Sequence, residues 1–177
     1  MAYERGKIFA MLTIVTGALT TALSVYVLAS CEFYEVTWTT EFGVRRVDTP
    51  GLLVCKYLDS DKNPEFAGPK NTFDVMALVG AFGGALLGLV ATVMVFNSYK
   101  KCLCRQQNTA VASFLFMMAV LSQGLTAIAI ISKACGDDFD GKCKYKLTGW
   151  LSIGAAGGFF LASSFNRETA PKPGIPR

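Results

Sequence analysis

The stretch that decides the fold class is VMALVGAFGGALLGLVATVMVFN, residues 75–97, which carries no charge and stops shortly before Lys100 and Lys101. A helix needs about 20 mostly apolar residues to cross a hydrocarbon core about 30 Å thick, and this stretch is long enough. Three more uncharged stretches meet the same criterion: 8–30, 109–132 and 147–166, the last being shorter and glycine-rich. The sequence therefore predicts an all-α membrane protein, a four-transmembrane-helix bundle that forms one domain over residues 1–177.

The composition supports the membrane class and excludes several others. Of the 177 residues 52% are hydrophobic and only 17% are charged, which is unusual for a soluble fold. The net charge of +4 does not indicate nucleic-acid binding, because the basic residues lie in short flanks beside apolar runs. Histidine is absent, and no charged residue interrupts a predicted span. We therefore expect no nucleic-acid partner, no cofactor, no metal and no enzymatic activity.

An even number of spans fixes which connections share a side of the membrane. The termini, the 98–108 connection and the 167–177 tail share one side; the 31–74 and 133–146 connections share the other. The first side carries basic residues in short flanks: Arg5, Lys7, Lys100, Lys101, Arg105, Arg167, Lys172 and Arg177. The positive-inside rule predicts that this side is cytosolic. The plasma membrane or an endomembrane is favoured, although organellar membranes impose the same constraints.

The six cysteines fall in pairs, one pair in each connection between spans. Those in the two outer connections are expected in an oxidising compartment, where disulfides persist. Pairing within each connection predicts the bridges Cys31 to Cys55 and Cys135 to Cys143. A bridge from Cys31 to Cys135 across the two connections, or four free thiols, are the alternatives.

The inner connection carries Cys102 and Cys104 within a basic segment. Cysteines beside a membrane span are common sites of reversible palmitoylation, which would hold this short loop against the inner leaflet. Zinc binding is the less favoured interpretation, because two closely spaced cysteines without histidine supply only half of a ligand set.

The first outer connection contains a stretch, 33–42, in which aromatic residues alternate with polar ones, and this pattern is typical of a β-strand. A second strand is predicted over 51–54, after the turn signal Thr49-Pro50. We expect a small disulfide-braced sheet followed by an irregular return over 59–70. The acidic second connection, around Asp137 and Asp138, lacks the ligand spacing of a calcium loop and is interpreted as a solvated turn closed by a disulfide.

Small residues recur on one face of two predicted helices. Lipid tails are as apolar as leucine, so membrane helices associate through the close approach that small residues permit. The predicted packing or assembly positions are Gly80, Gly84 and Gly88 in one helix and Gly154, Gly158 and Ala162 in another. They face either other helices of the same bundle or another molecule. Gln123 and the buried serines and threonines are predicted to form hydrogen bonds between helices.

The first outer connection also carries Gly51-Leu52-Leu53-Val54-Cys55, with Trp38 upstream. With four spans and cytosolic termini, this pattern resembles the claudin, peripheral myelin protein and calcium-channel gamma-subunit superfamily, whose first outer loop has a Gly-Leu-Trp motif followed by cysteine. Leu53 stands at the tryptophan position, and no second cysteine follows closely, so Cys31 would substitute from upstream. The resemblance implies a protein that acts through its surfaces without catalysing a reaction.

These observations predict a non-enzymatic tetraspan protein that serves as a structural, adhesion-like or auxiliary subunit. Its partners are expected to be membrane lipids and other membrane proteins or further copies of itself. The alternative is a small oligomeric channel whose acidic outer loops attract cations. The proline-rich tail after Ala170 cannot form a helix, and we expect a neighbouring protein to hold it in an extended form.

Overall fold

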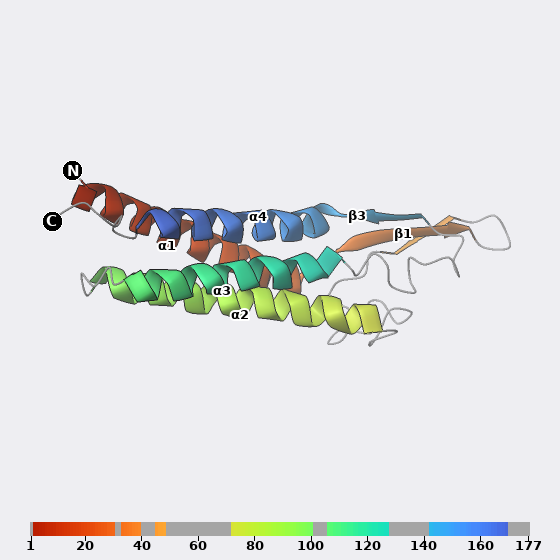
Figure 1. Cartoon of the computed structure of the whole chain (residues 1–177). Coiled ribbons are helices and arrows are strands. Elements are labelled where there is room, and N and C mark those ends of the chain that lie inside the picture. Colours follow the sequence, from red (N-terminus) through yellow and green to blue (C-terminus); the bar gives the residue numbers. More distant parts are fainter. Residues whose placement is uncertain are drawn as a thin grey trace.

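The computed structural model describes residues 2–30, 33–39, 45–48, 72–100, 106–127 and 142–169. Within these ranges the chain forms helices and a small sheet (Figure 1). The helices are α1 (Ala2–Ala29), α2 (Thr72–Lys100), α3 (Gln106–Gly124) and α4 (Leu147–Glu168). The strands are β1 (Tyr34–Thr39), β2 (Arg45–Asp48) and β3 (Lys142–Tyr145).

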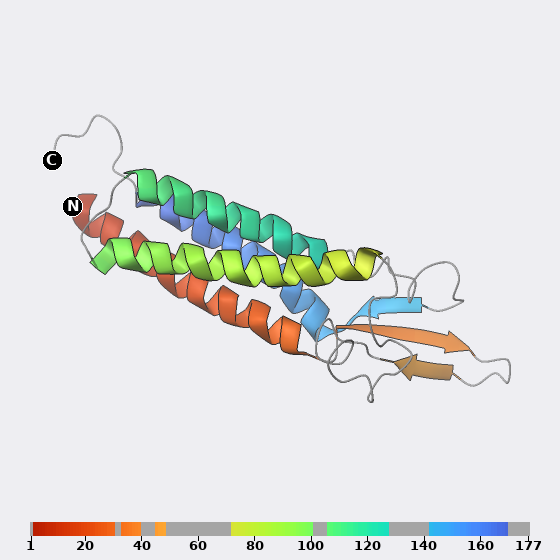
Figure 2. The same cartoon turned by 90° about the horizontal axis from the view of Figure 1, so that it is seen from below.

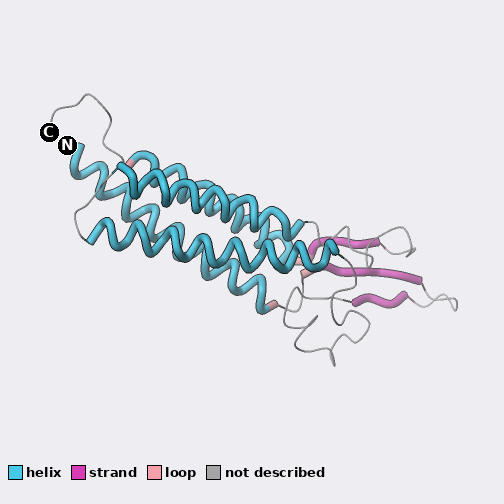
Figure 3. The backbone as a smooth tube through the Cα atoms, turned by 60° about the horizontal axis from the view of Figure 1, so that its bottom comes forward, coloured by secondary structure: helices cyan, strands magenta, loops and turns pink. Residues whose placement is uncertain are grey.

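The helices form an up-and-down bundle with the sheet at one end (Figures 2 and 3). Each helix packs against two neighbours, so that α1 and α3 each contact both α2 and α4, while the diagonal pairs touch little. The start of α1 and the end of α4 lie at the end of the bundle away from the sheet (Figure 2). We call that end the terminal end and the other the sheet end.

Three of the helices are long and apolar enough to cross a membrane, over Gly6–Ala29, Val75–Lys100 and Asn108–Ala127. Large apolar side chains cover their outward faces, and Leu19, Leu121 and Phe114 are more than 60% exposed. A surface of this kind suits hydrocarbon and not water. The chain is therefore an integral membrane protein. Helix α4 is not among the three, because its glycines and serines lower its mean hydropathy.

The interior of the bundle is built from small residues around two large rings. Phe116 of α3 and Phe159 of α4 are fully buried, and their rings are stacked with centroids 6.4 Å apart. Buried alanines surround them: Ala91, Ala112, Ala119 and Ala162. Small residues bring the helix backbones together, and the resulting dispersion contacts stabilise a bundle that has no water to exclude.

Helix α1 buries hydroxyl groups that are satisfied within the helix itself. The Thr13, Thr21 and Ser24 hydroxyls each donate to the carbonyl oxygen four residues earlier, at 2.8, 2.8 and 3.0 Å. A hydroxyl bonded in this way presents its apolar side to a neighbouring helix without leaving a polar group unpaired in the membrane.

The sheet joins segments from the two ends of the sequence. Its strand order is β2-β1-β3, and both pairings are antiparallel. In the central strand, Tyr34 lies opposite Tyr145, and Val36 lies opposite both Asp48 and Cys143. The Lys146 N–H donates to the Phe33 carbonyl oxygen at 3.2 Å, which extends the β1–β3 ladder to the start of α4. The sheet therefore ties the end of α1 to the start of α4.

The helix boundaries differ from the sequence-based ones at most ends. Helix α1 begins at Ala2, and α4 continues through Arg167 and Glu168, which the sequence analysis assigned to the tail. A charged residue ends the apolar run but does not interrupt helical hydrogen bonding, so a helix can continue beyond the hydrocarbon region. Helix α2 begins at Thr72, and α3 ends at Gly124 before a 3₁₀ turn, earlier than the predicted 132.

The strands also differ in part from the expectation. Strand β1 lies within the stretch 33–42 that the alternating pattern marks as extended. The strand predicted at 51–54 lies outside the described residues. Strand β3 occupies the end of the second outer connection, for which no strand was predicted, and its four residues pair with β1. The turn predicted around Asp137 and Asp138 lies outside the described residues. The signal in the sequence, an alternation over Lys142–Tyr145, is too short to be recognised alone.

Candidate functional site

The glycines of α2 lie against α3 and, across the bundle, against Phe159 of α4. A Cβ atom at Gly80 would overlap the Ser122 carbonyl oxygen of α3 and Leu125 just past that helix, and one at Gly88 would overlap the Phe159 ring of α4. A four-residue repeat advances by about 40° at each step on a helix of 3.6 residues per turn. Gly80 therefore faces α3, whereas Gly88, two steps further along the repeat, faces Phe159 of α4. These α2 glycines serve packing within the bundle.

The glycines of α4 divide between the interior and the surface. A Cβ at Gly158 would overlap the Thr20 hydroxyl of α1, and Ala162 is fully buried. At Gly154 and Gly157, by contrast, a Cβ would meet nothing within 4 Å among the described residues. The predicted stripe of Gly154, Gly158 and Ala162 is thus not one interface, because the drift of the repeat carries Gly154 to the outside of the bundle.

A closed ring of hydrogen bonds joins α3 to α4 toward the sheet end. Gln123 Nε2 donates to Ser152 Oγ at 2.8 Å, and Thr126 Oγ1 donates to the Gln123 carbonyl oxygen at 2.7 Å. The Ser152 and Thr126 hydroxyls lie 2.6 Å apart. Because the Thr126 proton is already donated, Ser152 is the donor in that pair. The predicted role of Gln123 as a hydrogen-bond partner between helices is confirmed.

The side-chain amide of Gln123 packs against a glycine of α2. A Cβ built at Gly84 of α2 would lie 2.5 Å from Gln123 Oε1, so a side chain at this position would displace the amide. This oxygen is buried and has no hydrogen-bond partner among the described residues. Closer to the sheet, the Ser30 hydroxyl donates to Thr148 Oγ1 at 3.3 Å and links the end of α1 to α4.

A second polar cluster lies near the terminal end, around Asn166 of α4. Asn166 Nδ2 donates to the Thr109 carbonyl oxygen at 2.7 Å and to Ser113 Oγ at 2.8 Å, both on α3. Ser163, one turn earlier, donates to the Ser113 carbonyl oxygen at 3.3 Å. Asn166 is fully buried, yet its Oδ1 has no hydrogen-bond partner among the described residues.

Asn166 also lines a small cavity of about 20 Å³ at the terminal end. All the helices contribute to its lining: Ala10 from α1; Val95, Ser98 and Tyr99 from α2; Asn108 and Thr109 from α3; Asn166 and, just past α4, Thr169. One lining contact is long, since Asn108 Nδ2 donates to Ser98 Oγ at 3.4 Å. Among the described residues the lining offers neutral oxygen and nitrogen atoms and carries no carboxylate.

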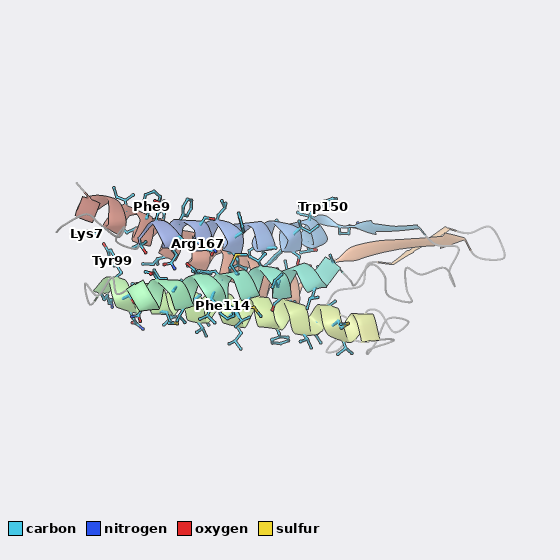
Figure 4. The ribbon with its side chains drawn as sticks, in the orientation of Figure 1. Lys7, Phe9, Tyr99, Phe114, Trp150 and Arg167 are labelled. Atoms are coloured by element: carbon cyan, nitrogen blue, oxygen red, sulfur yellow. The ribbon has the colours of Figure 1, made fainter. Side chains whose placement is uncertain are left out.

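Basic residues and aromatic residues mark the two ends of the bundle. Figure 4 shows Lys7, Tyr99 and Arg167 at the terminal end and Trp150 at the start of α4, near the sheet. Lys100 Nζ lies 4.6 Å from the centroid of the Phe96 ring, a cation–π contact. Trp and Tyr side chains are typical of the two membrane interfaces, with lysine and arginine beyond them.

Most of the other predicted site residues lie outside the part of the chain that the structure describes. Cys31, Cys55, Cys102, Cys104 and Cys135 lie outside the described residues, as do Gly51 and Leu52. Cys143 is placed in β3 and Trp38 in β1, in each case as backbone only. The pairing of the cysteines and the modification of Cys102 and Cys104 therefore stay predictions.

Sequence reasoning missed Asn166 as a buried polar residue. It was assigned to the last position of a span, next to Arg167, where exposure to the interface is the natural expectation. Its contacts with Thr109 and Ser113 depend on how α3 and α4 align, which the local sequence does not specify. In the part of the chain that the structure describes, no three His, Cys, Asp or Glu residues gather as a metal site would require.

Comparison of the sequence with protein-family models and with curated proteins finds no match.

Proposed function

We propose that this integral membrane protein is a non-enzymatic tetraspan subunit that acts by lateral association in the bilayer. The observation that carries the proposal is the outward face of α4, where a Cβ added at Gly154 or Gly157 would meet nothing within 4 Å among the described residues. The small size of glycine gives no advantage where the residue faces lipid. Where it faces a partner helix, it allows the two backbones to approach closely.

The outward face of α4 combines these glycines with large apolar side chains. Trp150, Ile153, Phe160 and Leu161 are all exposed, Trp150 by 61%. Gly154 and Gly157 lie between the Trp150–Ile153 pair and the Phe160–Leu161 pair along the helix. Glycines placed between large side chains leave room for the backbone of a partner helix to approach closely. We name this surface, formed by Trp150, Ile153, Gly154, Gly157 and Leu161, the α4 face.

The proposal includes α4 as the fourth span. Its 22 residues correspond to about 33 Å of helix, enough to cross the hydrocarbon core. Its only charged residues, Arg167 and Glu168, stand at its final positions. Four spans put both termini on one side, and the basic residues near Lys7, Lys100 and Arg167 favour the cytosol for that side.

The sheet then lies on the opposite side, where we propose that disulfides brace it, as Cys31 with Cys55 and Cys135 with Cys143. Strand β1 leads directly out of α1, and β3 leads directly into α4, so bridges near these strands would stiffen the connection between sheet and bundle. We further propose a likeness to the claudin and calcium-channel gamma-subunit superfamily, whose members act on neighbouring membrane proteins or copies of themselves, because the chain combines a bundle of helices with a strand in its first outer connection.

The test measures association in liposomes by energy transfer between labelled copies of the full chain at low protein-to-lipid ratio. Replacing both glycines, Gly154→Leu with Gly157→Leu, is expected to reduce the associated fraction about tenfold. The matched control is Gly124→Leu on α3, another glycine at which a Cβ meets nothing within 4 Å among the described residues.

An equal loss in the control variant, or no loss in the double variant, would contradict the role of the α4 face in self-association. Where wild-type copies do not associate, the same variants are compared for co-purification of other membrane proteins in mild detergent. Loss of specific partners from the double variant alone supports the proposal, and an unchanged set of partners opposes it.

A further inference from the structure

Helices α2 and α4 stand at opposite corners of the bundle, and their uncharged segments differ in length. Both pack against α1 and α3 and touch each other little. The uncharged segment comprises residues 75–99 in α2 and residues 147–166 in α4, and a charged residue bounds each segment at both ends. At 1.5 Å per residue the two segments extend over about 37 Å and about 30 Å. The α4 corner is therefore the shorter one, and Figures 1 and 2 show α2 extending beyond the start of α4 at the sheet end.

The exposed apolar side chains show the same difference between the two corners. The large ones on α2 extend from Val75 to Phe96, which corresponds to about 31 Å of helix. On α4 they extend from Leu147 to Leu161, which corresponds to about 21 Å. Beyond Leu161 the only large apolar side chain of α4 is that of Phe165, which is half-buried. Hydrocarbon therefore fits a thicker layer at α2 than at α4.

A change of tilt cannot match both corners to one bilayer. The helices pack as one bundle, so tilting it shortens the projected lengths of α2 and α4 by nearly the same factor. A bilayer that covers the apolar side of α2 must become thinner beside α4, or it covers Lys146 or Arg167 at the ends of that helix. Both alternatives cost free energy for each ångström of mismatch, and snorkelling of these two long side chains reduces the cost without removing it.

We propose that bilayer thickness regulates the lateral association of this protein through the α4 face, with a second copy of the chain as the partner. The inference rests on the four spans and the association proposed above. Lipid beside an unpaired α4 corner is thinned, and pairing of two α4 faces removes that lipid, because each short corner then meets another of equal length. The cost of thinning increases with the thickness of the surrounding bilayer, so association strengthens as the acyl chains lengthen.

The first test measures energy transfer between labelled copies of the full chain in phosphatidylcholine liposomes. The lipids carry monounsaturated acyl chains of about 14, 18 or 22 carbons, which changes the thickness of the hydrocarbon core. From the shortest to the longest chains we expect association to tighten about tenfold. Equally tight association in all three bilayers would overturn the regulation and leave the lateral association standing. Wild-type copies that stay apart in all three would overturn both.

A variant with a longer apolar segment tests the cause of this dependence. Arg167→Leu with Glu168→Leu extends the uncharged segment past the end of α4 without changing the net charge, and both side chains are exposed. The tenfold dependence on thickness is expected to fall to about twofold. The matched control is Arg167→Lys with Glu168→Asp, which keeps both charges and should retain the full dependence. An unchanged dependence in the lengthened variant would contradict mismatch at α4 as its cause.

The fluorescence of Trp150 tests the lipid beside a single copy, at a protein-to-lipid ratio too low for association. Trp150 is 61% exposed on the α4 face, and Trp38→Phe leaves it as the sole tryptophan. Brominated short-chain phosphatidylcholine, diluted into long-chain liposomes, should quench Trp150 about twice as strongly as its bulk fraction predicts, because short chains collect where the bilayer is thin.

The matched control carries its sole tryptophan on α2, as Val79→Trp in a chain with Trp38→Phe and Trp150→Phe. Val79 is also 61% exposed and lies one turn inside the uncharged segment, as Trp150 does. Quenching there should follow the bulk fraction of the short-chain lipid. Equal quenching at the two positions would overturn the proposal, whether or not the wild-type copies associate.

Discussion

Helices α2 and α4 are both rich in glycine, yet they use it differently. On α2, Gly80, Gly84 and Gly88 all lie against side chains or backbone of other helices in the same chain. On α4, Gly158 does the same, but Gly154 and Gly157 face outward. The glycines of α2 therefore serve packing within the bundle, whereas two glycines of α4 lie on its surface. A motif of small residues in a membrane helix therefore does not by itself show which helix those residues contact.

The largest expected effect that tests this comparison is that of Gly80→Leu. The nearest atom to its Cβ would be a backbone oxygen, that of Ser122, which cannot move without displacing α3. Overpacking at such a site is expected to lower the free energy of unfolding by about 3 kcal/mol. Reversible unfolding of the purified protein in mixed detergent micelles measures it. Gly154→Leu serves as control, and a similar loss there would remove the distinction between the two helices.

A smaller effect is expected at Gly88, where the neighbour is a side chain. Gly88→Ala forces the Phe159 ring to shift and should cost about 2 kcal/mol. The obstacle is the ring itself, so Gly88→Ala should cost less in a Phe159→Leu protein than in the wild-type protein. The same unfolding measurement yields the coupling free energy. Strictly additive effects of the two substitutions would show that Gly88 does not act through Phe159.

The hydrogen-bonded ring between α3 and α4 offers a third test. Ser152→Ala removes the hydroxyl that accepts from Gln123 Nε2 and donates to Thr126. Hydrogen bonds between membrane helices contribute modestly, so we expect a loss of about 1 kcal/mol. Ser164→Ala is the control, because the Ser164 hydroxyl is exposed and, among the described residues, donates only to the Phe160 carbonyl oxygen of its own helix. A larger loss at Ser164 than at Ser152 would contradict the importance of the ring.

The smallest effect on folding is expected on the α4 face. Gly154→Ala and Gly157→Ala add a methyl group that meets nothing within 4 Å among the described residues, so the free energy of unfolding should not fall by more than about 0.5 kcal/mol. Thermal unfolding of a monomeric preparation measures this without contribution from association. Marked destabilisation of the monomer would show that these glycines are needed inside the bundle, as those of α2 are.

The sequence by itself determined the class of the protein and the approximate helices. Uncharged runs such as 75–97 are sufficient, because a membrane requires each crossing segment to satisfy its own backbone and to present apolar side chains, and both conditions are local. The local pattern also identified Gln123 as a buried polar residue, since an amide within an apolar run needs a partner.

Only the tertiary structure decided which face of each helix is inside. The repeat of Gly154, Gly158 and Ala162 reads as one stripe in sequence, yet the rotation and alignment of α4 against α1 and α3 leave Gly154 outside and bury Asn166 against Thr109 and Ser113. The pairing of β1 with β3 joins segments separated by α2 and α3. Such relations depend on contacts between residues far apart in the chain, and a local pattern carries no information about them.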